Sequence, residues 1–192
     1  MEKDIENVYG LLKSYSPSCE QELQDKEFML WCMENMDNLL TRKNDQFHFT
    51  ASVFIINQSH KKVLAVYHNI YDSWSFVGGH ADGMKIMQNV ALKEAREETS
   101  LKNLEILNGG APISIEKLLV DQHYKNDKLV YEHYHLNFTF LLEADDQMPL
   151  VIKTDENSDI KWMTFDEFLD MVSEPKMLPI YKKIIKQIKS MY

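Results

Sequence analysis

The sequence predicts an α/β fold with a helical extension at its N-terminus. Apolar and polar residues alternate in several short segments after residue 46, which is typical of strands. Residues 83–99 have the apolar spacing of an amphipathic helix. The segment before them is rich in Glu, Asp, Asn and Met, with apolar positions at helical spacing. We therefore expect two parts, a helical extension over 1–46 and an α/β domain over 47–192.

The extension is interrupted at Tyr15-Ser16-Pro17-Ser18, because proline disfavours a helix across that point. After the break, a helix is predicted over 20–40 and is expected to dock on the main domain, with a dimerisation arm or a part of the substrate pocket as alternatives. The segments that alternate as strands do are 47–56, 62–68, 74–77, 104–107, 113–124, 129–142 and 160–163. The turns at 57–60 and 125–128 indicate hairpins.

Two helices are expected at the C-terminal end. Thr164 followed by Glu167 has the pattern of a capping box, which predicts a helix that begins there and is interrupted by Pro175. A final helix is predicted over 178–191. It has four lysines that we place on a solvated outer face: Lys182, Lys183, Lys186 and Lys189.

The charge and the cysteine content limit the classes of partner. The net charge of −9 gives no general attraction for nucleic acid or an anionic membrane. No apolar run approaches the roughly 18 residues of a membrane span, and the N-terminus does not have the pattern of a signal peptide. The two cysteines, Cys19 and Cys32, fit reduced thiols, so we expect a cytoplasmic protein.

The most informative stretch runs from Gly78 to Leu101. It opens with a Gly-Gly turn and continues into the helix that has Glu94, Glu97 and Glu98 at positions i, i+3 and i+4, and thus on one face. On a helical wheel these acids fall within the apolar half, where an unpaired charge would be costly. Hard divalent cations prefer several oxygen ligands, so the pattern predicts a metal site. Such ions would also bridge this acidic chain to a phosphorylated substrate.

This stretch resembles the signature of the Nudix hydrolases. Gly79 stands at the leading glycine of that signature, and five further residues match in register: Glu94, Ala95, Glu97, Glu98 and Leu101. A hairpin precedes the stretch, and a Trp-containing strand and a helix follow it. Glu156 lies six residues before Trp162, where many members have a further carboxylate.

The resemblance implies an α/β/α sandwich with a mixed sheet. It also implies hydrolysis of a diphosphate linkage in a nucleoside diphosphate joined to another group, with Mg²⁺ or Mn²⁺. The implied ligands are Glu97, Glu98 and the Gly78 carbonyl, and Glu94 would bind metal or orient water. Glu156 is a candidate general base or extra ligand, and Lys93 stands at an arginine position in the implied catalytic set. The expected contacts to substrate are Gly79, His80, His133 and His135.

Three positions depart from the signature. Lys85 reverses the charge at an expected glutamate, although the wheel directs it away from the acids. Lys93 keeps the charge of the expected arginine but lacks its planar fork. Ser100 replaces a glycine, which carries a cost if the backbone needs a positive φ. We expect an altered metal count or a reduced rate.

Two alternatives follow from these departures and from the fold. The first is a catalytically weakened Nudix-fold protein that binds nucleotides or regulates another process. The second is an activity like that of isopentenyl-diphosphate isomerase, which ranks low because neither cysteine lies in the matching domain. A homodimer is a further expectation. The sequence has no motif that would recognise a particular nucleotide base, so it does not specify the substrate.

Overall fold

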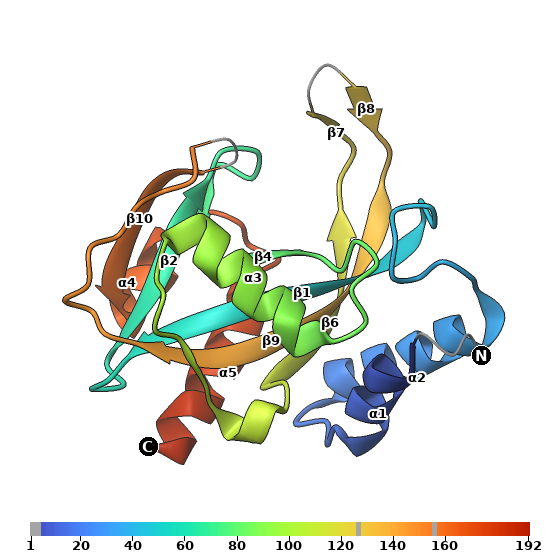
Figure 1. The fold of residues 1–192 in the computed structure, drawn as a ribbon, viewed down its shortest axis with the longest axis horizontal. Helices are drawn as coiled ribbons and strands as arrows, with labels where there is room; N and C mark the ends of the chain where they lie inside the picture. The colour runs from blue at the N-terminus through green and yellow to red at the C-terminus, as the bar shows by residue number, and fades with distance from the viewer. Residues whose placement is uncertain (1–4, 126–127, 155–156) are drawn as a thin grey trace.

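Two long strands, β1 (Phe47–Asn57) and β9 (His133–Ala144), run parallel to each other through the centre of the fold. The computed structural model describes residues 5–125, 128–154 and 157–192. Both strands are buried along most of their length because helices cover both faces of the sheet (Figure 1). The expected α/β/α sandwich with a mixed sheet is confirmed.

The main sheet has the order β10 (Asn157–Thr164), β2 (Lys62–His68), β1, β9 and β5 (Glu105–Ile106). Three further strands pair at its sides: β3 (Ser73–Ser75) with β2, β4 (Val77–His80) with β1, and β6 (Ser114–Val120) with β9. A short 3₁₀ helix, η2 (Asn108–Gly110), follows β5. The predicted Gly-Gly turn is wrong, because Gly78 and Gly79 lie within β4, where they pair with Ser52 and Ala51 of β1 beside the sheet centre.

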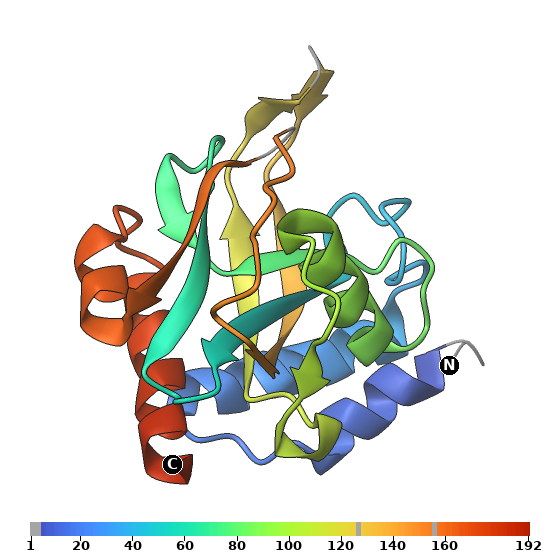
Figure 2. The same cartoon turned by 60° about the vertical axis from the view of Figure 1, so that its left-hand side comes forward.

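A separate hairpin projects from the body of the molecule (Figures 1 and 2). It consists of β7 (His123–Lys125) and β8 (Lys128–Val130), which pair antiparallel. The sequence predicted continuous strands on each side of this connection. Instead β6 ends at Val120 and β9 begins at His133, so the hairpin is a distinct two-stranded unit.

Alternate residues of β1 enter two different hydrophobic cores, as the period of two requires. Phe49, Ala51 and Val53 pack in one core with the helix α3 (Met87–Thr99). Phe54 and Ile56 pack in the other with α4 (Phe165–Met171) and α5 (Leu178–Met191). Figure 1 accordingly shows α3 in front of the sheet and α5 behind it.

The N-terminal helices α1 (Glu6–Ser14) and α2 (Glu20–Asn35) belong to the same core as α3. They contribute the fully buried side chains of Val8, Leu12, Met29 and Cys32. The predicted helix over 20–40 ends earlier, at Asn35, because Met36 is extended and Asn38 has a φ of 60°. Leu39 is buried nevertheless, and its carbonyl accepts a hydrogen bond of 2.7 Å from the Phe49 N–H.

The C-terminal predictions are confirmed except for one lysine. The Thr164 capping box is present in both directions with Glu167. Lys183, however, is not on the solvated outer face. Its side chain is 13% exposed and makes ion pairs with Glu22 at 2.9 Å and with Glu116 at 3.3 Å.

Of the helices in the described part of the chain, none combines the length and the apolar character that a bilayer crossing requires.

Candidate active site

The two glycines in the middle of β4, Gly78 and Gly79, allow this strand to approach its neighbours closely. A Cβ atom placed on Gly79 would collide with the carboxyl group of Glu94 on α3. A Cβ atom placed on Gly78 would lie 2.6 Å from the Ser52 Oγ and 2.9 Å from the Ala51 carbonyl oxygen. At Gly78 the close contacts include backbone, so glycine is required there, whereas at Gly79 an added Cβ atom would displace the Glu94 side chain. Since successive residues of a strand face opposite sides, Gly79 faces α3 and Gly78 faces the other side.

We expect the substitution Gly79→Ala to lower hydrolytic activity by about 100-fold with little loss of stability, because the added methyl group displaces the flexible Glu94 side chain and not backbone. Steady-state kinetics and thermal unfolding would measure the two effects. Gly10→Ala is the matched control, because nothing lies within 4 Å of a Cβ atom at Gly10. A Gly79→Ala variant with unchanged kcat would show that the Glu94 position is not critical.

The helix α3 begins at Met87, four residues later than predicted. Asp82 has a φ of 45° and Gly83 a φ of 89°, and a helix cannot run through residues with positive φ. Lys85 therefore precedes the helix, so its predicted wheel position does not apply, and Ile86 is exposed instead of lying on the buried face. The Met87 N–H donates to the Asn7 Oδ1 at 3.2 Å, so the N-terminal extension caps α3.

The three glutamates of α3 differ in burial. The Glu94 side chain is 12% exposed, and Glu98 is buried. Glu97 is 44% exposed, at the rim of the same face. Two of the acids thus lie beside the buried Ala91 and Ala95, in agreement with the helical wheel.

Lys93 lies between two of these carboxylates. Its Nζ is 2.7 Å from the Glu94 Oε1 and 3.3 Å from the Glu97 Oε2. The hydrogen bond to Glu94 raises the pKa of Lys93, so the side chain stays charged. The Lys93 ammonium therefore contacts two glutamates of the predicted site. This is expected for a residue that keeps the positive charge of the arginine found at this position of the signature.

Glu98 is oriented from a different part of the chain. The Asn157 Nδ2 on β10 donates to the Glu98 Oε2 at 2.9 Å, and Asn157 is itself buried. No local pattern predicts this contact, because the β5 to β9 region separates the two residues in the chain. Glu156, the predicted extra carboxylate, lies outside the described residues.

Ser100 adopts the left-handed conformation that a C-terminal glycine would adopt without strain. Its φ is 60° and its ψ is 10°, and its N–H donates to the Arg96 carbonyl. The Ser100 Oγ makes only a long hydrogen bond of 3.4 Å, to the Val151 carbonyl. The cost anticipated for a positive φ at this position is therefore present.

We expect Ser100→Gly to raise the free energy of unfolding by about 1 kcal/mol, because a non-glycine residue in the left-handed region costs about that amount. For a chain of this size the melting temperature should rise by about 2–4 °C. Ser100→Ala is the control, because it removes the same hydroxyl but keeps the Cβ atom. A gain of equal size in Ser100→Ala would refute the conformational explanation.

The predicted substrate-contacting histidines come together on the face of the sheet opposite α3. The ring centroids of His80 and His135 are 4.7 Å apart, and those of His133 and His135 are 5.0 Å apart. A fourth member, His48 on β1, was missed. Its ring centroid lies 5.0 Å from those of both His80 and His133. Burial, followed by the neighbouring histidines, lowers the pKa of His135 well below its ordinary value.

A buried polar network continues from the histidines along the same face. The Asn137 Oδ1 accepts hydrogen bonds from Thr50 at 2.9 Å and from Ser52 at 3.0 Å. The Asn137 Nδ2 donates to the Glu116 Oε2 at 3.1 Å. The alternation that the sequence showed for His133, His135 and Asn137 thus corresponds to one polar face of the central strands.

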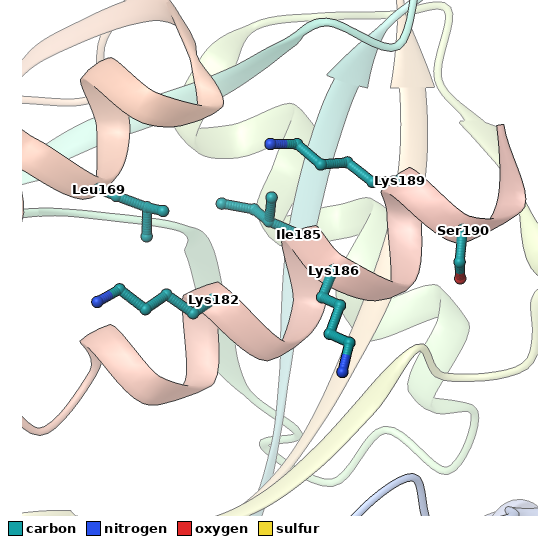
Figure 3. A pocket seen from close by; sticks show the side chains of 6 residues that line it. All are labelled: Leu169, Lys182, Ile185, Lys186, Lys189 and Ser190. Carbon is teal, nitrogen blue, oxygen red and sulfur yellow. The ribbon is translucent and has the colours of Figure 1, made fainter.

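A hollow of about 340 Å³ lies on α5, away from these groups (Figure 3). It is lined by Leu169, Lys182, Ile185, Lys186, Lys189 and Ser190. The side chains of Lys182 and Lys186 point in different directions, so they do not converge on one ligand. None of the predicted site residues in the described part of the chain lines it.

The comparison with protein-family models decides the family. The model described as the NUDIX domain matches residues 46–188, which is most of the chain. This chain belongs to the NUDIX family. The match begins at the start of β1, so it contains the two glycines of β4, α3 and the histidine-bearing strands and leaves out α1 and α2.

Solved structures of NUDIX proteins share the fold. A hydrolase of the family from Clostridium perfringens has a TM-score of 0.55 and 21% identity, over 73% of this chain and 97% of that one. An Ap4A hydrolase from C. elegans has a TM-score of 0.55 and 16% identity, over 74% and 98%. The NUDIX domain of Shewanella oneidensis NrtR, in complex with ADP ribose, has a TM-score of 0.52 and 15% identity, over 83% and 97%. No curated protein sequence matches this chain.

Proposed function

We propose that this NUDIX chain hydrolyses a diphosphate linkage in a nucleoside diphosphate joined to another group, with Mg²⁺ or Mn²⁺ as the cofactor. The observation that carries the proposal is that Glu94, Glu97 and Glu98 share one face of α3, with Glu94 against Gly79 of β4. These carboxylates are the oxygen ligands that a hard divalent cation prefers.

The residues of this face fit a cation. The Lys93 ammonium contacts Glu94 at 2.7 Å and Glu97 at 3.3 Å, so two carboxylates are already close enough to share one positive charge. Glu98 and the Gly78 carbonyl would supply further oxygens. Once bound, a divalent ion would neutralise diphosphate oxygens and lower the pKa of an attacking water.

The remaining roles follow from what each side chain contacts. Asn157 donates a hydrogen bond to one oxygen of Glu98 and so helps to orient that carboxylate. Glu94, whose carboxyl group lies close to Gly79, would orient a water or accept its proton. Lys93 holds Glu94 and Glu97 in position as the expected arginine would. Glu156 remains our candidate for a further base or ligand.

A substrate screen tests this proposal. The purified chain would be incubated with nucleoside triphosphates, nucleotide sugars, dinucleoside polyphosphates and ADP-ribose, each with Mg²⁺ or Mn²⁺, and product release would be measured. We expect turnover of at least one class and none in the presence of a chelator. The absence of turnover for every class, together with the absence of Mg²⁺ or Mn²⁺ binding, would refute the proposal.

A second candidate is a NUDIX protein that binds nucleotides without hydrolysing them. It is favoured by the Lys93 ammonium, which occupies the space between Glu94 and Glu97, and by the reversed charge at Lys85. Calorimetry would then detect nucleotide binding without product. Turnover restored by Lys85→Glu would show that the scaffold is otherwise competent. The cytoplasmic location and the homodimer remain predictions.

A further inference from the structure

Four histidines from three strands face one another at one end of the sheet. We call them the histidine cluster: His48 on β1, His80 on β4, and His133 and His135 on β9. One ligand nitrogen from each ring lies within 4.8 Å of those of the others. The sequence assigned three of these histidines to substrate contact, but the carboxylates of the hydrolysis proposed above lie on the opposite face of the sheet, so that proposal does not account for this arrangement.

The strand register explains why the rings meet. His48 is the Cα partner of His135 in the parallel pair of β1 and β9. Thr50 on β1 is the partner of His80 in the antiparallel pair of β1 and β4. Paired residues of a sheet point to the same face, so all the rings project to the side opposite α3. The backbone of three strands therefore fixes the cluster.

Backbone carbonyls fix the tautomers of two rings. The His48 Nδ1 lies 3.0 Å from the Asn44 carbonyl oxygen, and the His133 Nδ1 lies 2.8 Å from the Tyr131 carbonyl oxygen. A carbonyl only accepts, so each Nδ1 must donate its proton, and each Nε2 then presents a lone pair. Metal-binding histidines in proteins have the same pattern, in which the ring nitrogen that does not bind the metal donates its proton to a carbonyl or carboxylate oxygen.

The ring nitrogens lie close enough to one another to share one ion. The His48 Nε2 is buried and has no hydrogen-bond partner among the described residues. The His133 Nε2 lies 3.2 Å from the His135 Nε2. Two ligand nitrogens of a tetrahedral zinc ion, each about 2.05 Å from the metal, are about 3.3 Å apart. One pair already has this separation, and rotation of side chains would bring in the others.

We propose that the histidine cluster binds one divalent transition-metal ion, with Zn²⁺ as the best match. Imidazole nitrogen suits zinc, copper and nickel, whereas Mg²⁺ and Ca²⁺ require oxygen ligands. Four protein ligands complete a tetrahedral shell without an open position, which is the arrangement of a structural site. The ion would join β1, β4 and β9, and it would fix His80 directly after Gly79. It would thereby hold the glycine segment of β4 in position without taking part in the chemistry.

Metal analysis of the tag-free chain tests this proposal. The protein would be purified without chelator, dialysed against micromolar ZnCl₂, and measured for bound zinc and for thermal stability. We expect about one zinc per chain. We also expect the melting temperature to rise by about 5–10 °C relative to the chelator-treated chain, because an ion at about 100 times its Kd stabilises only the folded form. Substitution by Co²⁺ should give the strong visible absorption of a tetrahedral site.

Variants separate this site from other zinc-binding groups. His133→Gln combined with His135→Gln should lose the bound zinc, the cobalt absorption and the thermal shift, and His48→Gln provides a second variant in case the double variant folds poorly. His123→Gln, on the projecting hairpin, is the matched control and should keep all three signals. Glu98→Gln should keep them as well. Failure of the wild type to bind zinc, or retention of zinc by either cluster variant, would overturn the proposal. Neither result would affect the proposed hydrolysis.

Discussion

Replacing Lys183 by methionine is expected to lower the free energy of unfolding by about 3–5 kcal/mol, the cost of leaving buried charges without their partner. Methionine keeps the length of the side chain and its helix propensity, so the change removes the ammonium group and little else. The lost contacts are those to Glu22 at 2.9 Å and to Glu116 at 3.3 Å. Urea unfolding would measure the effect.

The effect is large because both carboxylates are inaccessible. Glu22 is 0% exposed and Glu116 is 1% exposed. Burial alone would raise the pKa of Glu22, but the Ser18 N–H, at 2.7 Å, and Lys183 together bring that pKa below its ordinary value. Without Lys183 two carboxylates that both contact Ser114 would repel each other. This ion-pair network also joins α2, β6 and α5, so its loss would weaken the packing of α2 on the rest of the domain.

The pH dependence gives a more specific check. The stability that a lowered carboxyl pKa contributes is present above the unfolded pKa, about 4.3, and is lost as the pH falls through the folded value. In Lys183→Met, the charged forms of Glu22 and Glu116 are buried without a cation, which destabilises the fold, and protonation of these acids removes that cost. The difference from the wild type should therefore be largest near pH 7 and should shrink towards pH 4.

Lys182→Met is the matched control, because Lys182 is exposed on the same helix and its loss should change stability by less than about 0.5 kcal/mol. Adding Glu116→Gln to Lys183→Met should recover part of the loss. A Lys183→Met protein that is as stable as the Lys182→Met protein would show that the network contributes nothing.

The buried lysine illustrates what local pattern leaves unspecified. The sequence pattern predicted the bounds of α5 correctly. It also assigned Lys183 to a solvated stripe with three other lysines. Its partners are on α2 and β6, more than 60 residues away in the chain. A helical wheel shows which residues share a face, but it does not show that an acidic pair from elsewhere covers one of them.

The same distinction applies to the two candidate sites. Glu94 and Glu98 were predictable because i, i+4 spacing within one helix determines a shared face. The histidine cluster was only partly predictable: His133 and His135 alternate on one strand, whereas His48 joins them through a parallel pairing 87 residues away. Parallel register depends on the whole fold, and no signal near His48 specifies it. The start of α3 was missed because two positive-φ residues, Asp82 and Gly83, lie within an apolar pattern that continues across them.

Glu98→Gln is expected to reduce kcat by about 1,000-fold while the protein stays folded. Glutamine keeps an oxygen that can accept the 2.9 Å hydrogen bond from Asn157, so the local packing is preserved. It removes a negative charge from the proposed cation site, and a loss of about 4 kcal/mol of charge stabilisation in the transition state corresponds to this factor. Kinetics on the substrate found in the screen, at several Mg²⁺ concentrations, would measure it.

The magnesium dependence distinguishes a ligand from a residue that acts only through the fold. If Glu98 binds the cation, the Mg²⁺ concentration for half-maximal activity should rise in Glu98→Gln, and thermal unfolding should stay close to that of the wild type. Glu105→Gln, exposed on β5, should change neither quantity. Full activity in Glu98→Gln would place the cation elsewhere. Loss of activity with an unchanged magnesium requirement would instead assign Glu98 to the handling of water, because a lost ligand must weaken metal binding whereas a lost base need not.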